Sequence, residues 1–266
     1  MTINYLDSKR IQGLSTDTKP TNVQTNSIFE QTDTNTRHWY NGTTWIDGGF
    51  LPSDISALYS WHDASDASTI TKSSNFVSQW NDKSGNSKNF TASGTEPLWI
   101  SASQNGKDVI DTIGSKYMSY PLTVQAQPIT ICIASQIPTD ANGYGMIFRA
   151  GNSPYMLYGH SATDQLTIAS ITNQYLNEVG IDGTWQSSII VFNGSSSALY
   201  LNDISKITGN TGTTGLDNAS FYLGINANNY NLHSNTKYGE ILIYAKELNA
   251  TERGQINTYF INKWGL

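Results

Sequence analysis

Carboxylates and histidines supply much of the catalytic chemistry of proteins, and their spacing in this sequence argues against catalysis. Glycoside hydrolysis needs two carboxylates that face each other across a cleft. No glutamate in the chain is followed two positions later by a second carboxylate. The four histidines are scattered without metal-ligand spacing, and no Gly-x-Ser-x-Gly sequence marks a nucleophile. The sequence therefore predicts no catalytic residues and a protein that is not an enzyme.

Aspartates near residue 60 to 80 are the candidates for metal binding. Asp63, Asp66 and Asp82 offer the carboxylate oxygens that calcium prefers, and calcium tolerates irregular loops. The same residues are also typical of turns, and no EF-hand spacing occurs. His62 and Asp63 are adjacent, so their side chains would point to opposite faces of a strand. Calcium is thus the one cofactor that the sequence allows for, beside the alternative that these aspartates only form turns.

Asparagine-rich segments that contain a tyrosine are the candidate ligand-binding elements. A sugar is held by an aromatic ring against its apolar face and by amides or carboxylates at its hydroxyls. Residues 226–235 and 140–145 contain both residue types. The candidate glycan-binding residues are Asn228, Asn229, Tyr230, His233, Asn142, Tyr144 and Tyr175. Ordinary soluble turns have the same composition, so both interpretations stand.

Short strands are the elements that would position these residues. Charged residues make up only 14% of the chain, and Gly, Ser, Thr and Asn separate short apolar runs. This composition favours β-strands joined by turns. The predicted strands are 55–63, 76–80, 129–136, 144–150, 155–159, 165–170, 185–192, 198–201, 221–225 and 238–244. Many short strands with regular turn signals predict a two-sheet sandwich or a barrel.

One segment near the end of the chain has helical spacing instead. Apolar and basic side chains recur at intervals of three and four between residues 256 and 263, and Asn249 or Thr251 is a suitable N-cap. We expect a single C-terminal helix that ends before Gly265.

The first fifty residues differ in composition and predict a separate module. Aromatic-containing segments at 27–33, 37–40 and 43–46 are joined by polar turn residues, including the hairpin pair Asn41-Gly42. They predict a small three-stranded meander, which is marginal by itself. Gly48-Gly49 provides a joint, so we expect a module at 1–50 and a larger domain at 51–266.

Charge, cysteine content and the N-terminus limit the partners and the location. The 15 basic and 21 acidic residues give a net charge of −6 without a basic stripe, so nucleic acid is not an expected partner. Cys132, the only cysteine, lies in an apolar run and is expected to be a buried thiol. We expect neither a signal peptide nor insertion into a membrane, since the N-terminus lacks a signal pattern and no apolar run is long enough.

Two stretches of the larger domain carry a family resemblance. The first runs from Leu58 to Ile70 and from Val77 to Asn86; the second runs from Tyr238 to Tyr244 and resumes in the terminal helix. Both resemble concanavalin A-like lectin/glucanase domains, a group that includes laminin-G-like domains. The resemblance implies an all-β fold, namely a two-sheet antiparallel jelly roll with one C-terminal helix. It does not identify a ligand, because the group includes lectins, hydrolases, adhesins and structural spacers.

Residues 13–21 and the hairpin around Tyr40-Asn41-Gly42-Thr43-Thr44-Trp45 are similar to small modules in tail-fibre and other virion proteins of tailed viruses. This similarity implies a virion surface protein, of the capsid decoration or tail-fibre type, whose module attaches to the particle. The jelly roll would then mediate adhesion to glycans or to the host surface. The implied partners are other virion proteins and other copies of the chain, in a homo-oligomer such as a trimer, because many weak sites give avidity.

Two alternatives remain open. The first is a polysaccharide-active enzyme or its carbohydrate-binding module, which a pair of facing carboxylates in a cleft would favour. The second is a purely structural capsid component, in which residues 226–235 would be buried between copies.

Overall fold

A computed structural model of the chain contains two compact units, residues 1–55 and 56–266. The structure describes residues 3–6, 10–24, 27–34, 36–40, 42–47, 50–114, 116–137, 145–151, 156–160, 165–170, 175–178, 183–217, 219–226, 229–233 and 235–266. The sequence placed the division after residue 50. Each unit has its own sheet and its own buried apolar side chains.

The smaller unit is a five-stranded sheet. Its strands lie in the order β1 (Asn4–Tyr5), β2 (Arg10–Gly13), β3 (Ile28–Gln31), β4 (Thr36–Tyr40) and β5 (Trp45–Asp47). Ile11 and Phe29 are buried in it, and the ring of Trp45 meets Phe29 edge-on with centroids 5.9 Å apart. The predicted meander is present as β3–β4–β5. The prediction missed β1 and β2. For β2 the reason is that it pairs with β3 in parallel, and a parallel pair has no hairpin turn to reveal it.

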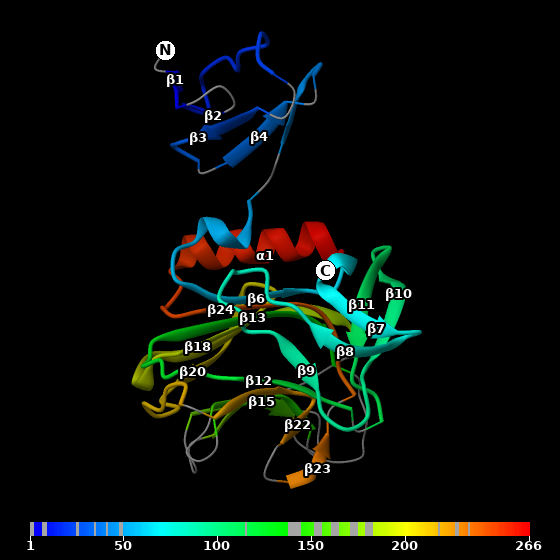
Figure 1. The fold of residues 1–266 in the computed structure, drawn as a ribbon. Coiled ribbons are helices and arrows are strands. Elements are labelled where there is room, and N and C mark those ends of the chain that lie inside the picture. Colours follow the sequence, from blue (N-terminus) through cyan, green and yellow to red (C-terminus); the bar gives the residue numbers. More distant parts are fainter. Residues whose placement is uncertain are drawn as a thin grey trace. The chain divides into compact units, whose positions relative to one another are not determined.

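Two antiparallel layers make up the larger unit (Figure 1). One layer has the order β6 (Leu58–Asp63), β24 (Lys237–Tyr244), β13 (Ile129–Gln136), β18 (Trp185–Phe192), β19 (Ser197–Leu201) and β20 (Ile204–Gly209). The other has the order β9 (Phe90–Ala92), β12 (Met118–Pro121), β21 (Ser220–Leu223), β14 (Gly145–Ala150), β15 (Met156–His160), β16 (Leu166–Ala169) and β17 (Tyr175–Glu178).

Four further strands join the layers. They are β7 (Ile70–Ser73), β8 (Phe76–Trp80), β10 (Leu98–Gln104) and β11 (Lys107–Asp111). β8 pairs with β7, β9 and β10, β10 pairs with β11, and β11 pairs with β24. The predicted all-β, two-sheet antiparallel sandwich is thereby confirmed.

The strand β13 shows how the core sets the sequence pattern. Ile129, Ile131 and Ile133 belong to the hydrophobic core of the larger unit. The alternate residues, Cys132 among them, are buried as well, and the helix α1 (Ala250–Trp264) packs against this strand. Burial on both faces requires a continuous apolar run instead of an alternating one. The prediction of a buried thiol is confirmed.

The C-terminal helix begins and ends where the sequence indicates. Asn249 Oδ1 accepts a hydrogen bond from Glu252 N, and Glu252 Oε2 accepts one from Asn249 N, each at 3.0 Å. This reciprocal pair is a capping box. Gly265 ends the helix with φ +68°, a left-handed conformation that glycine adopts readily. Ile256 and Phe260 are fully buried on the inner face.

No helix in the described part of the chain combines the length and the apolar character that crossing a bilayer requires.

The segment 226–235, which the sequence predicts to be an asparagine-rich loop, contains strand residues. β22 (Ile225–Asn226) and β23 (Asn229–His233) pair with each other in an antiparallel manner. Both lie beside β14, and Figure 1 shows them at the end of the larger unit that is remote from α1. Asparagine is depleted in strands in general, so its abundance here concealed the pairing.

Candidate ligand-binding site

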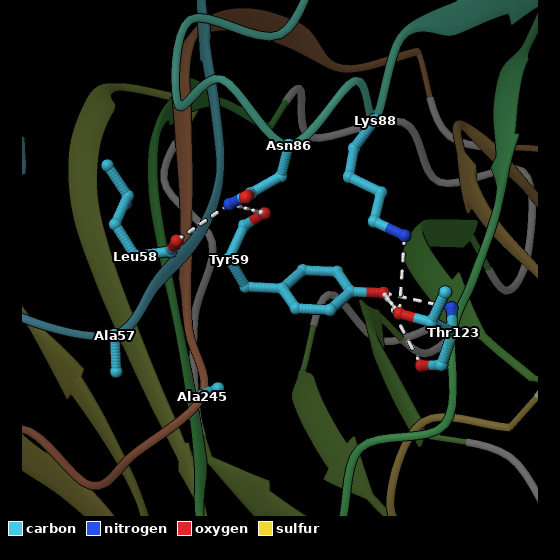
Figure 2. Close-up of a pocket in the computed structure, with 7 residues that line it drawn as sticks. All are labelled: Ala57, Leu58, Tyr59, Asn86, Lys88, Thr123 and Ala245. Carbon is cyan, nitrogen blue, oxygen red and sulfur yellow. Dashed lines mark hydrogen bonds between the residues drawn. The ribbon is translucent and has the colours of Figure 1, made fainter.

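The larger unit contains a shallow pocket beside the start of β6 (Figure 2). Its volume is about 360 Å³, and its lining consists of Ala57, Leu58, Tyr59, Asn86, Lys88, Thr123 and Ala245. Three of these residues are aliphatic, one is aromatic, and the others carry an amide, an ammonium and a hydroxyl group. The volume lies near the lower end of the range for small-molecule sites, so it suits a single sugar ring or a group of similar size.

Four segments that are distant in sequence form this pocket. Leu58 and Tyr59 begin β6, Asn86 and Lys88 lie between β8 and β9, Thr123 follows β12, and Ala245 follows β24. A hydrogen bond of 2.9 Å from Ala245 N to Ala57 O holds two of the segments together. Tyr59 and Thr123 are 64 positions apart. Only the tertiary fold brings them into contact, which explains why the sequence did not identify this site.

The carboxylate of Asp82 shapes the segment that carries Asn86 and Lys88. Asp82 Oδ1 accepts hydrogen bonds from Trp61 N and Ser84 N, both at 2.9 Å, and Oδ2 accepts one from Lys88 N at 3.0 Å. Burial acts to raise the pKa of Asp82, but these backbone donors outweigh it, and the pKa lies below its ordinary value. The ionised carboxylate therefore ties the segment to β6.

His62 holds the same segment from the core side. Its Nε2 lies 2.8 Å from Lys88 O, and its ring packs against Phe90 and Tyr120, with centroids 4.4 and 5.7 Å away. Burial lowers the pKa of His62 to about 4, so the ring is neutral near pH 7. A carbonyl only accepts hydrogen bonds, which places the ring proton on Nε2. The backbone of Lys88 is thus fixed at its N–H by Asp82 and at its C=O by His62.

The polar side chains of the pocket, Tyr59, Asn86, Lys88 and Thr123, form its rim (Figure 2). Hydrogen bonds within this rim determine which groups remain for a ligand. Lys88 Nζ donates to Thr123 Oγ1 at 3.2 Å and lies 5.0 Å from the centroid of the Tyr59 ring. Thr123 N donates to the Tyr59 hydroxyl at 3.0 Å. Asn86 Nδ2 donates to the carbonyls of Leu58 and Tyr59 at 3.0 and 3.1 Å. No described residue takes up the remaining ammonium N–H groups of Lys88 or the Oδ1 acceptor of Asn86, which leaves these groups for a ligand.

The three candidate calcium ligands have other partners. Lys83 Nζ lies 3.0 Å from Asp63 Oδ2 and 2.8 Å from Asp66 Oδ2, so a lysine ammonium stands between these two carboxylates. Asp82 accepts from backbone N–H groups, as described above. Within the described ranges, no three or more His, Cys, Asp or Glu side chains are grouped so that they could hold a metal ion. Calcium binding gains no support from these residues and remains a prediction.

A second set of charged residues lies beneath α1. Glu240 is fully buried, and burial raises its pKa. The donors to its carboxylate are Trp61 Nε1 (2.7 Å), Tyr259 OH (2.8 Å), Lys263 Nζ (2.7 Å) and Trp264 Nε1 (3.0 Å). Lys263 Nζ also lies 2.8 Å from Asp63 Oδ2. These contacts fasten α1 to the sheet. Asp63 faces the helix whereas His62 faces the core, as their adjacency predicts.

The residues predicted to bind glycans fall largely outside what the structure describes. Asn142, Tyr144 and Asn228 lie outside the described residues. Asn229, Tyr230 and His233 belong to β23 and Tyr175 belongs to β17, but only the backbone of these residues is described. Their role in binding stays a prediction.

Several solved structures with a β-sandwich are similar to this chain in fold. A mutant sialidase of Trypanosoma rangeli with trans-sialidase activity matches with a TM-score of 0.59 at 13% identity, over 81% of this chain and 35% of that chain. Domain 4 of AbnA, a GH43 extracellular arabinanase from Geobacillus stearothermophilus, was solved with arabinotriose. It matches with a TM-score of 0.58 at 14% identity, over 75% of this chain and 98% of that domain.

The binding domain of Paraclostridial Mosquitocidal Protein 1 also matches, with a TM-score of 0.58 at 12% identity, over 77% of this chain and 53% of that chain. The chain spans between about a third and a half of the length of the sialidases it matches. At such low identities these likenesses show the fold alone. No protein-family model matches the sequence, and no curated protein does.

Proposed function

We propose that this protein binds glycans through the pocket beside β6 and catalyses no reaction. The observation that carries the proposal is the pocket itself, whose lining combines aliphatic side chains and a tyrosine with hydrogen-bond donors and acceptors. Sugar recognition uses this combination of apolar contact and a few convergent polar groups. The likeness to a domain solved with arabinotriose supports a binding role for such a sandwich, while the pocket's own residues define the ligand.

A binding role is favoured over hydrolysis because the described residues that line the pocket include no carboxylate. Asp63 and Glu240, which are both buried, share Lys263 beneath α1 and do not line the pocket. The alternative of a polysaccharide-active enzyme predicts release of reducing ends when the protein is incubated with polysaccharides. We expect no release above that of a heat-inactivated sample, and steady release would replace the proposal by the alternative.

The proposal is tested by applying the purified full chain to a broad glycan array and measuring saturable binding. Ala245→Phe places a ring in the pocket and should abolish binding. Ala250→Phe is the matched control, because Ala250 is exposed in the first turn of α1 and does not line the pocket. If Ala245→Phe bound glycans as the wild type does, the binding site would lie outside this pocket. Tyr230→Ala would then be the next variant to test. Absence of binding to any glycan by the folded protein would refute the proposal.

We also propose the particle setting that residues 1–50 imply, in which the smaller unit attaches the protein to a virion and the sandwich acts in adhesion. Its support is the sequence similarity to tail-fibre modules, together with the division of the chain into two compact units. Immunogold labelling of particles from a culture that produces the protein should decorate the particle surface. If the gold label were found only on free protein and not on particles, the proposed attachment to a virion would be wrong.

A further inference from the structure

Resting on the proposed function, we propose that the pocket beside β6 selects anionic sugars. A carboxylate or sulfate group of the sugar binds Lys88 Nζ, and a hydroxyl group of the same ring donates to Asn86 Oδ1. The shared chemistry is an anion carried on a hydroxylated ring. This selectivity is argued from the charge of Lys88, from the contacts that hold its ammonium group, and from the donors and acceptors that Lys88 and Asn86 leave for a ligand.

Among the described residues that line the pocket, Lys88 is the only charged one. Three other lysines of the larger unit have carboxylate partners: Lys83 pairs with Asp63, Lys246 with Glu252, and Lys263 with Glu240. No described carboxylate forms an ion pair with Lys88, whose contacts are the Thr123 hydroxyl and the face of the Tyr59 ring. A cation beside a pocket without a counter-ion attracts an anion, and charge-assisted hydrogen bonds are the stronger kind.

The position of this cation is fixed before a ligand arrives. The backbone N–H of Lys88 donates to Asp82, and its C=O accepts from the buried His62 ring. The ammonium then rests against Thr123 and Tyr59, so little conformational freedom is left to lose on binding. Such pre-organisation is typical of a binding group, whereas most surface lysines are free to move.

The polar groups of the rim differ in kind between its two sides. Lys88 Nζ supplies only donors, whereas Asn86 has used its N–H groups on the Leu58 and Tyr59 carbonyls and presents an acceptor. A ligand must therefore offer an acceptor to one side and a donor to the other. A uronic acid or sulfated sugar does both, and its apolar face can contact the aromatic and aliphatic side chains of the same lining, which include Tyr59, Ala57 and Ala245.

The experiment compares matched pairs of sugars by calorimetry with the full chain. Each pair is a carboxylated or sulfated oligosaccharide and its uncharged parent of equal length. The anionic member should bind at least about tenfold more tightly, and added salt should reduce this preference. Lys88→Met should remove the preference, whereas Lys88→Arg should retain it. The control is Lys72→Met, which removes the same charge from β7, where Lys72 covers the Trp99 ring 4.0 Å away.

The possible results separate this inference from the function on which it rests. Preference for carboxylated over sulfated sugars, or the reverse, identifies which anion is bound, provided that Lys88→Met abolishes it. Equal binding of both members of every pair, with Ala245→Phe still blocking, would overturn the charge selection and leave glycan binding in place. Unchanged affinity in Lys88→Met would overturn the selection as well. Failure of all sugars to bind would refute both proposals.

Discussion

At the scale of single residues, His62 connects the aromatic core of the larger unit to its pocket. The ring is fully buried among Trp80, Phe90 and Tyr120, and burial lowers its pKa from 6.5 to about 4. Between these two values the unfolded chain binds a proton at this histidine and the folded protein does not. The free energy of unfolding therefore carries no penalty from His62 above about pH 6.5. As the pH falls towards 4, this residue lowers the free energy of unfolding by at most about 3 kcal/mol.

This prediction is checked by urea unfolding between pH 7 and 4 for the wild type and for His62→Gln, whose amide can still donate to Lys88 O. The variant should lack the decline that belongs to His62. Asp63, Asp66 and Asp82 have lowered pKa values, so their contributions are lost only below about 3.8, outside this window. Glu240 and Asp111 have raised pKa values and act with the opposite sign, equally in both proteins. If the free energy of unfolding changed in the same way with pH in the wild type and in His62→Gln, the decline could not be assigned to His62.

At the scale of elements, the fit between α1 and β24 depends on Gly239. A Cβ atom at this position would lie 2.9 Å from two ring atoms of Trp264. Trp264 cannot yield, because it is fully buried and stacks on Trp185 with centroids 6.0 Å apart and an interplanar angle of 1°. Gly239→Ala should therefore lower the free energy of unfolding by about 1–3 kcal/mol.

Urea unfolding of Gly239→Ala, Trp264→Leu and the double variant tests this prediction. The double variant should lose less stability than the sum of the single ones, since the smaller side chain relieves the clash. Gly254→Ala is the matched control, because no atom lies within 4 Å of a Cβ built there, in the interior of α1. It should stabilise the protein by about 0.5–1 kcal/mol. Strictly additive losses would show that Gly239 and Trp264 do not interact.

Elements with buried apolar patterns could be predicted from the sequence, and mostly polar ones could not. The strands at 76–80, 129–136 and 185–192 have the predicted bounds, because burial requires apolar side chains at regular positions. β20 was missed: its first three residues, from Ile204 to Lys206, are exposed, and pairing with β19 sets its conformation. β10 was missed for the same reason, since none of its residues is fully buried.

At the scale of the whole molecule, the sequence predicted the sandwich but not the pocket. A fold class follows from patterns within short windows, whereas the pocket requires the relative positions of four segments. Tyr59 was predicted to lie in a strand, and Asn86 was noted as the end of a stretch that resembles lectin/glucanase domains. Lys88 and Thr123 carry no local signal at all, because a single lysine or threonine in a polar segment is ordinary. Their contact across 35 positions appears only once β6, β9 and β12 are assembled.

The division into two units predicts that residues 56–266 fold without the rest. The hydrophobic core of this unit draws its members from positions 64 to 243 and none from the first 55 residues. A fragment covering 56–266 should therefore unfold in one transition, with the same midpoint that this unit shows in the full chain. If the smaller unit is the assembly element, light scattering should find the fragment monomeric and the full chain oligomeric. A fragment that stays oligomeric would assign assembly to the sandwich, and one that fails to fold would show that the two units depend on each other.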